Sequence, residues 1–376
     1  MARRSLTFDF YFNYLAWVLG GLGLSANFVA TIRFQRWLMN RALLLHNVRL
    51  FLLIVILLFP FLSNAQDKIR IGLSSVSATN GSVWVAEDKG LFKKYGADVE
   101  VIVIGGGGAR VVSSLVAGDI HFSVGGGEGS IRSQLKGVET VIVASTLTKG
   151  LQRILARPEI KTYQDLKGKR IAITQFGSAG HLALLLMLKK WNMRTDQVQI
   201  ITLGSSPAML VGLDKGGADA AVLTMPTFFL AEEKGYRVVG DPANMDIFYL
   251  QNTLESTRAF LRNNRDRALK FMKGYIEGMA YFKKNKRESL DVMRKKLRIQ
   301  SEQERDSRYL ELSYNLLAST FYNEVPYPSL KGVQTILDKI GEEEPKVKER
   351  DAKSFVDDSF VKELDDSGFI KALYAR

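Results

Sequence analysis

The residues of this sequence that are best suited to chemistry are small or polar and lie in short glycine-rich segments. One segment holds four consecutive glycines, Gly105–Gly108, with Arg110 two residues further on. Backbone amides without side chains can approach a ligand closely, and an arginine at the start of a helix can bind a carboxylate or sulfonate through its guanidinium fork. No Gly-Lys-Ser/Thr follows at the spacing of a nucleotide-phosphate loop. We therefore predict that Gly107, Gly108 and Arg110 bind an anion; the alternative is an Arg110 that points outward.

A second candidate anion site lies at residues 175–181, which open a long apolar stretch ending at Trp191. Ser178 offers a hydroxyl, Gly177 and the residue after Ser178 offer backbone amides, and His181 lies on the first turn of the expected helix. Such helix starts favour negatively charged groups. A plain helix-capping role for Ser178 is the alternative, and it is compatible with ligand binding. We predict ligand contacts from Phe176, Gly177, Ser178 and His181.

A third polar segment, residues 77–82, precedes a helix that carries Trp84. Here Thr79 and Asn80 supply polar contacts, and the indole ring of Trp84 supplies an apolar wall on which a ligand could stack. In the alternative interpretation Trp84 packs in the core and Ser82 only caps the helix.

Two more segments complete the predicted site. Gly127 and Glu128 follow a strand, and Glu128 either binds an amine or a ring N–H, or is an ordinary first-turn residue stabilised by the helix dipole. Thr224 and Met225 follow another strand and would close the wall of the site.

The residue types argue against catalysis and metal binding. The chain has no cysteine and only three histidines, so disulfides, thiolate metal sites, cysteine nucleophiles and a histidine-rich metal centre are not expected. No Ser/His/Asp order or close pair of carboxylates stands out. His121 lies inside an expected strand and is taken as a packing residue. We therefore expect no catalytic residue, no metal and no cofactor.

The elements that must position these segments alternate between β-rich and helical stretches. Alternation of this kind predicts parallel sheets joined by helices, and the chain length suggests two lobes. The expected strands are Ile69–Leu73, Val99–Ile104, Ile120–Val124, Thr140–Ala144, Arg170–Thr174, Val198–Leu203, Ala220–Leu223 and Arg237–Val239. The expected helices among them include Ser82–Lys89, Ala109–Val116, Ala179–Trp191 and Ala208–Leu213.

The order of elements also hints at duplication. Leu115-Val116-Ala117-Gly118-Asp119 leads into one strand, and 213–219, with the same helix, glycine stop and aspartate, leads into another. Two similar α/β units facing each other create a cleft for a small molecule. In parallel sheets, ligands lie beyond the carboxyl ends of the strands. Residues 256–376 are expected to be almost wholly helical.

The amino terminus has the pattern of a secretory signal. Thirteen apolar residues at 50–62 follow Arg41 and Arg49 and precede Ser63-Asn64-Ala65, so cleavage is expected after Ala65. A signal of ordinary length would start at Met39 and span 39–65, which makes 1–38 a mis-called extension. The alternative is a membrane-anchored protein with an uncleaved helix at 11–30.

Charge gives little support for nucleic-acid binding. The full chain has 52 basic and 39 acidic residues and a net charge of +13. Without residues 1–65 it would carry +8, and the charges of the remainder are interleaved. We expect no nucleic-acid partner, although a mild positive field favours anionic ligands.

Several motifs together resemble a known family. They are the run Gly90-Leu91-Phe92-Lys93-Lys94-Tyr95-Gly96, the glycines 105–108, the Leu-x-x-Gly-Asp helix stop, and Tyr163-Gln164-Asp165-Leu166-Lys167-Gly168-Lys169-Arg170-Ile171-Ala172. They resemble solute-binding proteins of ABC importers, in the sulfonate/taurine/nitrate-binding group that is similar to thiamine-pyrimidine-synthase-like proteins. The resemblance covers about 68–290.

This resemblance implies a type II periplasmic binding fold, in the α/β class, with two lobes, a hinge and a helical C-terminal part. The first lobe would comprise 67–148 with 249–376 and the second 149–248, joined near 146–150 and 249–253. It also implies a periplasmic protein, an expected monomer, that delivers a small organic anion (a sulfonate, a carboxylate or a pyrimidine-like molecule) to an ABC permease and ATPase at the inner membrane. The alternatives are a ligand-binding sensor and a thiamine-pyrimidine-synthesis enzyme. The family enzyme needs a cysteine-rich motif that this chain lacks.

Overall fold

The computed structural model describes residues 68–245, 247–299 and 304–375, with a few separated positions between 14 and 41. Two compact units are present, Met1–Gln66 and Asp67–Arg376, and the description below concerns the second unit. The expected leader at 39–65, its cleavage site and most of 1–38 lie outside the described residues. Within the described part of the chain, no helix combines the length and the apolar character needed to cross a membrane.

The first sheet has five strands in the order β2-β1-β3-β10-β4. β1 (Ile69–Leu73) lies parallel to both β2 (Val99–Val103) and β3 (Phe122–Gly125). β10 (Phe248–Thr257) then returns from a distant part of the chain and lies antiparallel between β3 and β4 (Thr140–Lys149). The two ten-residue strands β4 and β10 therefore tie this sheet to the start and the end of the intervening segment.

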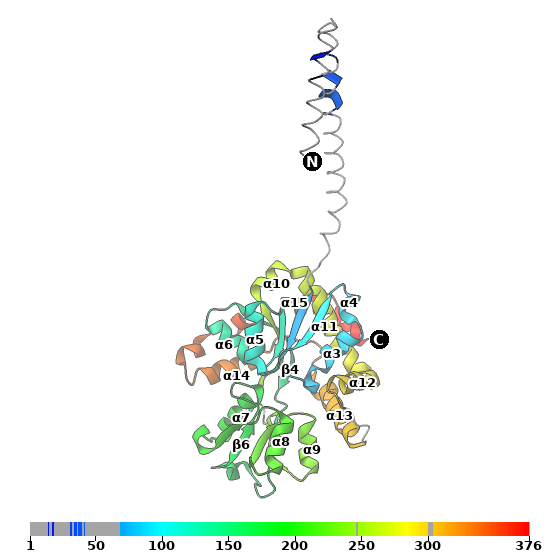
Figure 1. Ribbon diagram of the computed structural model, residues 1–376. Coiled ribbons are helices and arrows are strands. Elements are labelled where there is room, and N and C mark those ends of the chain that lie inside the picture. The colour runs from blue at the N-terminus through cyan, green and yellow to red at the C-terminus, as the bar shows by residue number, and fades with distance from the viewer. Residues whose placement is uncertain are drawn as a thin grey trace. The chain divides into compact units, whose positions relative to one another are not determined.

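That intervening segment builds the second sheet, in the order β7-β6-β8-β5-β9. β6 (Arg170–Ile173) lies parallel to β7 (Gln199–Thr202) and β8 (Ala220–Leu223), whereas β5 (Arg153–Ala156) is antiparallel to β8 and β9 (Arg237–Gly240). Figure 1 shows the two lobes, with β4 in one and β6 in the other. The α/β, two-lobed fold expected from the sequence is confirmed.

Helices cover both sheets. In the first lobe they are α3 (Gly81–Asp88), α4 (Leu91–Lys94), α5 (Gly107–Ala117), α6 (Glu128–Leu135) and the C-terminal helices α10 to α16. The C-terminal set comprises α10 (Arg258–Asn263), α11 (Arg265–Lys284), α12 (Lys286–Lys296), α13 (Glu304–Leu316), α14 (Leu330–Ile340), α15 (Ser359–Asp366) and α16 (Phe369–Tyr374). The second lobe carries α7 (Ala179–Lys190), α8 (Ser206–Asp214) and α9 (Thr227–Glu233).

The sequence prediction of the strands was incomplete in two places. β5 was not predicted, and β10 was missed where the chain was expected to cross between lobes and turn helical, so the helical part begins at Arg258 rather than 256. The other expected strands are present, with ends that differ by up to a few residues, most of all β4, which continues to Lys149.

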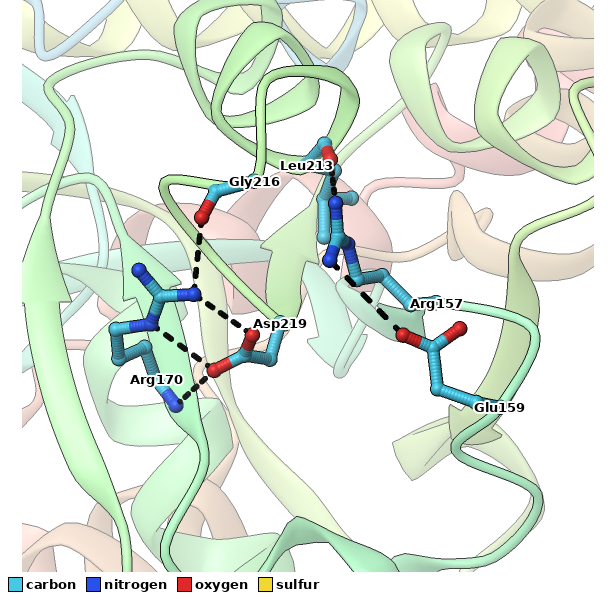
Figure 2. Close-up of polar contacts among 6 residues, drawn as sticks. All are labelled: Arg157, Glu159, Arg170, Leu213, Gly216 and Asp219. Carbon is cyan, nitrogen blue, oxygen red and sulfur yellow. Dashed lines mark hydrogen bonds and ion pairs between the residues drawn. The ribbon is translucent and has the colours of Figure 1, made fainter.

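At the amino ends of the parallel strands of the second lobe, Asp219 clamps the start of β6. Its carboxylate accepts hydrogen bonds from the backbone N–H of Arg170 (2.9 Å) and from two guanidinium nitrogens, at 3.0 and 2.8 Å. Figure 2 shows this clamp, with Arg170 also donating to the carbonyl of Gly216 and the neighbouring Arg157 pairing with Glu159. Because the clamp lies at the opposite strand ends from the predicted ligand loops, it supports the lobe and takes no part in the predicted site.

Candidate functional site

Two of the predicted loops pack against each other within the first lobe. A side-chain carbon on Gly108, at the start of α5, would lie 3.0 Å from the backbone oxygen of Gly126. A side-chain carbon on Gly129 would lie 3.0 Å from the oxygen of Gly108. Because few real Cβ atoms lie so close to backbone, a side chain at either position would force the neighbouring backbone to shift, and the two glycines allow this close contact between the loops.

The second lobe meets these loops at the start of α7. The side-chain amide of Gln175 donates a hydrogen bond to the carbonyl of Gly106. A side-chain carbon on Gly107 would lie 2.6 Å from that amide and 4.0 Å from the Cβ of Ser178. The structure therefore brings together the predicted glycine loop and the predicted Ser178 loop, from opposite lobes.

A third loop joins the same meeting point. A side-chain carbon on Gly126 would lie 3.5 Å from the Cβ of Ala179, the first residue of α7. The beginnings of α5, α6 and α7 are thus neighbours. Each helix presents backbone N–H groups without helical partners at its first turn, so the arrangement favours a negatively charged group.

Side chains also bridge the lobes away from the loops. Lys189 of α7 forms an ion pair with Glu342, which follows α14, at 2.6 Å. Tyr309 of α13 donates to Glu233 of α9, and its ring stacks on that of Phe229. The lobes are therefore also in contact outside the predicted loops.

The loop before α7 is partly occupied by its own hydrogen bonds. Ser178 Oγ accepts from the backbone N–H of His181 at 3.2 Å, which is a helix cap, and the side chain is buried. The backbone N–H of Gly177 donates to Nδ1 of His181 at 3.1 Å. Contrary to our expectation, the Gly177 amide is therefore not free for a ligand. Phe176 is 62% exposed and meets the His181 ring edge-on.

The His181 ring is held in its neutral form. Burial lowers its pKa, and the positive charges of Lys339 and Arg132 lower it further. Since Nδ1 accepts a hydrogen bond, the neutral ring carries its proton on Nε2 and can donate only from that atom.

The two predicted charged residues differ in availability. Arg110 is exposed, and its side chain folds back over Gly106, where an added side-chain carbon would lie 2.6 Å from Cδ of Arg110. Within the described part of the chain Arg110 has no ion pair. Glu128 is the first residue of α6 and accepts from Nε of Arg132 at 2.8 Å, one turn later. Glu128 thus has the ordinary first-turn role that we considered as the alternative.

The structure places two predicted apolar contacts in the core. Trp84 is 2% exposed and packs within the main hydrophobic cluster, so it presents no face to a ligand. Met225 is 3% exposed and belongs to the same cluster, while the hydroxyl of Thr224 donates to the carbonyl of Met225. The prediction that Trp84 and Met225 line the cleft is corrected: tertiary packing buries both.

The first predicted loop has a structural role through Asn80. This residue is 3% exposed, and its side-chain amide donates to the carbonyl of Ser75 at 2.8 Å. The backbone oxygen of Thr79 accepts from Asn252 at 2.8 Å and from the hydroxyl of Tyr322 at 2.9 Å. The Asn80 amide therefore shapes the loop, while the Thr79 backbone anchors it to β10.

The sequence-based prediction missed a polar cluster where the chain crosses between lobes. The hydroxyl of Tyr249 contacts the side-chain oxygens of Gln152 and Gln251, and it lies 3.5 Å from the carbonyl of Ala179. Burial raises the pKa of Tyr249, so the hydroxyl keeps its one proton and can satisfy one acceptor at a time. The polar run Gln251-Asn252-Thr253 inside an apolar strand was the available signal.

A buried carboxyl in β10 was also missed. Glu255 is fully buried and accepts from Ser123 Oγ at 2.6 Å and from Thr253 Oγ1 at 2.7 Å. Burial raises its pKa to about 7. β10 at this point pairs with β3, whose carboxyl end leads into the Gly126 loop.

The fold and the meeting of loops from two lobes define a protein of the periplasmic binding type. The family model described as "NMT1/THI5 like" matches residues 79–289, more than half of the chain. The chain belongs to this family.

Curated relatives are named as binding proteins. A protein of Brucella abortus (strain 2308) described as a binding protein is 31% identical over 221 residues, which are 57% of this chain and 67% of that protein. The taurine-binding periplasmic protein of Escherichia coli (strain K12) is 32% identical over 130 residues, 34% of this chain and 40% of the relative. The resemblance inferred from the sequence motifs is confirmed.

Solved structures share the fold at low identity. The aliphatic sulphonate binding protein of Escherichia coli matches with a TM-score of 0.63 and 18% identity, covering 79% of this chain and 99% of that chain. The alkanesulfonate-binding protein of Xanthomonas axonopodis pv. citri, bound to MOPS, gives 0.62 and 16%, covering 80% and 98%. A desulfurization enzyme gives 0.55 and 14% over 80% of this chain and 99% of that one, so binders and an enzyme share this fold.

Proposed function

We propose that this chain is the extracytoplasmic solute-binding component of an ABC importer, which captures a small organic anion between its lobes and delivers it to the permease and ATPase. The observation that carries the proposal is the meeting of α5 and α7, from opposite lobes, at Gly107 and Ser178. The names of the relatives, binding proteins for taurine and sulfonates among them, support the same role.

The charge at this meeting point supports an anion. The first turns of α5, α6 and α7 contribute backbone N–H groups, and Arg110 contributes a positive charge beside Gly106. The opposing charge of Glu128 is paired with Arg132, and His181 is neutral. A sulfonate or carboxylate fits this environment better than a cation.

The ligand contacts that we propose keep the residues predicted from the loops except those that the structure buries or pairs, namely Asn80, Trp84, Glu128, Gly177 and Met225. We propose Gly107, Gly108, Arg110, Gly127 and Ser178 as the anion-binding core. Phe176, His181, Thr79 and Thr224 are proposed at its periphery, and the interlobe contacts add Gln175.

The division into lobes at 148/149 and 248/249 is part of the proposal. β4 and β10 cross the two boundaries side by side, and paired strands of this kind can bend as a hinge. A ligand would enter after the interlobe contacts open, and the closed form would be what the permease recognises. Export and cleavage of the leader after Ala65 would place the protein in the periplasm. We propose that it acts there as a monomer.

The experiment is a binding screen on the purified protein with taurine, an alkanesulfonate, benzoate and a pyrimidine carboxylate. A ligand that binds only the folded state raises the melting temperature, and titration calorimetry then measures its affinity. Small-angle scattering should show a more compact particle at saturation. A cationic ligand that binds while every anion fails would contradict the proposed ligand class.

Arg110→Ala tests the charge argument directly. We expect the free energy of anion binding to weaken by about 1.5–3 kcal/mol, the scale of a charge-assisted hydrogen bond. Arg194→Ala, an exposed arginine of the second lobe paired with Asp196, is the matched control and should leave affinity unchanged. If Arg110→Ala has no effect while Glu128→Gln abolishes binding, the ligand is not an anion.

A further inference from the structure

One hydrogen bond at the start of α7 depends on the protonation state of a histidine. The backbone N–H of Gly177 donates to Nδ1 of His181 at 3.1 Å. Nδ1 can accept only while it carries no proton, because both ring nitrogens of an imidazolium are donors. Protonation of Nδ1 would therefore set two N–H groups against each other, and the Gly177 amide would lose its acceptor.

This hydrogen bond lies in the loop that carries the second-lobe part of the proposed anion site. Gly177 is exposed, and it lies between Gln175 and Ser178, both of which approach Gly107 of the first lobe. The Ser178 hydroxyl is already used as a helix cap. The Gly177 amide and Nδ1 of His181 are therefore the pair of groups in this loop whose mutual contact a ligand could replace.

The charges around the His181 ring come from the first lobe. Burial is the largest cause of the lowered pKa of His181, followed by Lys339 of α14 and Arg132 of α6, whereas Glu343 acts in the opposite direction. The carboxylates that pair with these two cations are Glu342 and Glu128, respectively. The ring is therefore neutral until a further negative charge enters the site.

A bound sulfonate or carboxylate would reverse this balance. Its negative charge offsets the positive charge of the imidazolium, and its oxygens can accept charge-assisted hydrogen bonds from the Gly177 N–H and from protonated Nδ1. By linkage, a ligand that favours the protonated ring binds more tightly as the pH falls.

We propose that the interlobe site captures its anion together with one proton, which Nδ1 of His181 takes up from solvent while the ligand replaces Nδ1 as the acceptor for the Gly177 N–H. This inference rests on the proposed function and adds the regulation of the same site. The anions favoured at low pH are those of strong acids, sulfonates above all, because carboxylates begin to lose their own charge in the same range.

The first test needs no ligand. Phe176-Gly177 is the only Phe-Gly pair in the sequence, so labelling phenylalanine in its carbonyl carbon and glycine in its nitrogen gives one coupled amide signal in the NMR spectrum of the full chain. This Gly177 signal should shift with pH at the same midpoint as the His181 ring, whose own signal is the one missing from the spectrum of His181→Gln. A Gly177 signal that does not follow the ring overturns the proposal.

The second test adds ethanesulfonate, which stays ionised throughout the range used. It should raise the pKa of His181 by about one unit, and its affinity in titration calorimetry should rise about five- to tenfold from pH 8 to pH 5. The glutamine of His181→Gln can still accept from the Gly177 N–H but cannot ionise, so the affinity of this variant should change by less than about twofold over the same range.

His121 is the internal control. Its Nδ1 also accepts from a backbone N–H, that of Arg70 at 2.9 Å, but at the opposite strand ends from the ligand loops. Its titration should therefore not move when ethanesulfonate is added. If circular dichroism shows that His181→Gln does not fold, His181→Asn takes its place.

The outcomes separate this inference from the proposed function. Ethanesulfonate that binds equally well at pH 8 and pH 5 overturns the proton coupling and leaves the importer proposal standing. An equal pH dependence in wild type and His181→Gln also overturns it, and assigns the effect to another group such as Glu255. If ethanesulfonate binds at neither pH, the inference fails, and the binding screen with the other anions decides the proposed function by itself.

Discussion

In each lobe a side chain accepts a hydrogen bond from a backbone N–H of the strand that opens the lobe's parallel unit, and the two lobes use different side chains for it. In the first lobe, the backbone N–H of Arg70 in β1 donates to Nδ1 of His121 at 2.9 Å. In the second lobe, the corresponding N–H of Arg170 in β6 donates to the carboxylate of Asp219 at the same distance. Both acceptors reach the start of the first strand from the residues just before a neighbouring strand. The two lobes therefore share the position of this hydrogen bond but not the residue type that accepts it.

The two lobes place a carboxyl group in opposite electrostatic environments. Glu255 of the first lobe is buried without a cation, and burial raises its pKa to about 7. Asp219 of the second lobe is held by Arg170, whose hydrogen bonds lower its pKa below 3.8. The two groups therefore give the lobes opposite pH dependence, which offers a way to tell them apart in solution.

The largest expected effect is the pH dependence of the first lobe. The unfolded pKa of a glutamate is near 4.5 and the folded pKa of Glu255 is about 7. The stabilisation that comes from protonated Glu255 is fully present below pH 4.5 and is lost as the pH rises through 7, because burial disfavours the ionised carboxylate in the folded state. The loss should be about 3 kcal/mol in the free energy of unfolding.

Urea unfolding between pH 4.5 and 8 measures this effect. The glutamine of Glu255→Gln cannot ionise. The difference in the free energy of unfolding between wild type and variant should therefore change with pH, while the pH dependence of the variant itself comes only from the other titratable groups. Parallel pH profiles for the two proteins would show that Glu255 does not titrate in this range.

The next effect compares the glycines of the two loop systems. Gly108→Ala places Cβ 3.0 Å from the backbone oxygen of Gly126, which cannot move aside as a side chain would, so we expect destabilisation of about 1–3 kcal/mol. Gly177→Ala in the second lobe meets nothing within 4 Å and has only its positive φ of 74° to accommodate, at about 1 kcal/mol. Denaturant unfolding of both variants tests the order. The reverse order would mean that the contact between the first-lobe loops relaxes easily.

The smallest effect concerns the clamp of the second lobe. Asp219→Asn keeps an acceptor for the backbone N–H of Arg170 but removes the negative charge. Because Asp219 and Arg170 are both partly exposed to solvent, the free energy of unfolding at pH 7 should fall by less than the loss expected from ionisation of Glu255. The lowered pKa of Asp219 means that this contribution is present above pH 3.8 and disappears as the pH falls through the folded pKa. The difference in unfolding free energy between wild type and variant should therefore narrow as the pH is lowered from 7 to well below 3.8. A difference that does not narrow at low pH, and that does not change with added salt, would assign the effect to the shape of the side chain.

The fold was predictable where strand and helix alternate locally. Ile69–Leu73 and Ala220–Leu223 are short apolar runs bounded by turn residues, and both are strands as expected. β5 and β10 escaped prediction because they are antiparallel strands and do not belong to the local strand–helix–strand alternation. In β10, Gln251-Asn252-Thr253 interrupts the apolar pattern, and partners far away in the sequence, such as Thr79 and Gly125, supply the hydrogen bonds that hold it.

The site was predictable only at the level of loops. The rule that ligands lie beyond the carboxyl ends of parallel strands selected the glycine loop and the Ser178 loop, and the structure brings both together. Single side chains were less predictable, because their state depends on non-local packing. Trp84 and Met225 enter the core, and Tyr249 meets Gln152, which lies 97 residues away in the sequence. The pairing of Glu128 with Arg132 is local and follows the i,i+4 spacing of a helix.

The pairing of β4 with β10 has a consequence for how such a protein can change. Lys149 and Phe248 are cross-strand partners, so the chain leaves for the second lobe and returns from it at positions only about 5 Å apart. Residues 150–247 therefore form a cassette with adjacent ends, whose exchange by recombination would keep the first lobe intact. Such an exchange would replace α7 and its loop in one step, and with them half of the proposed solute-binding surface.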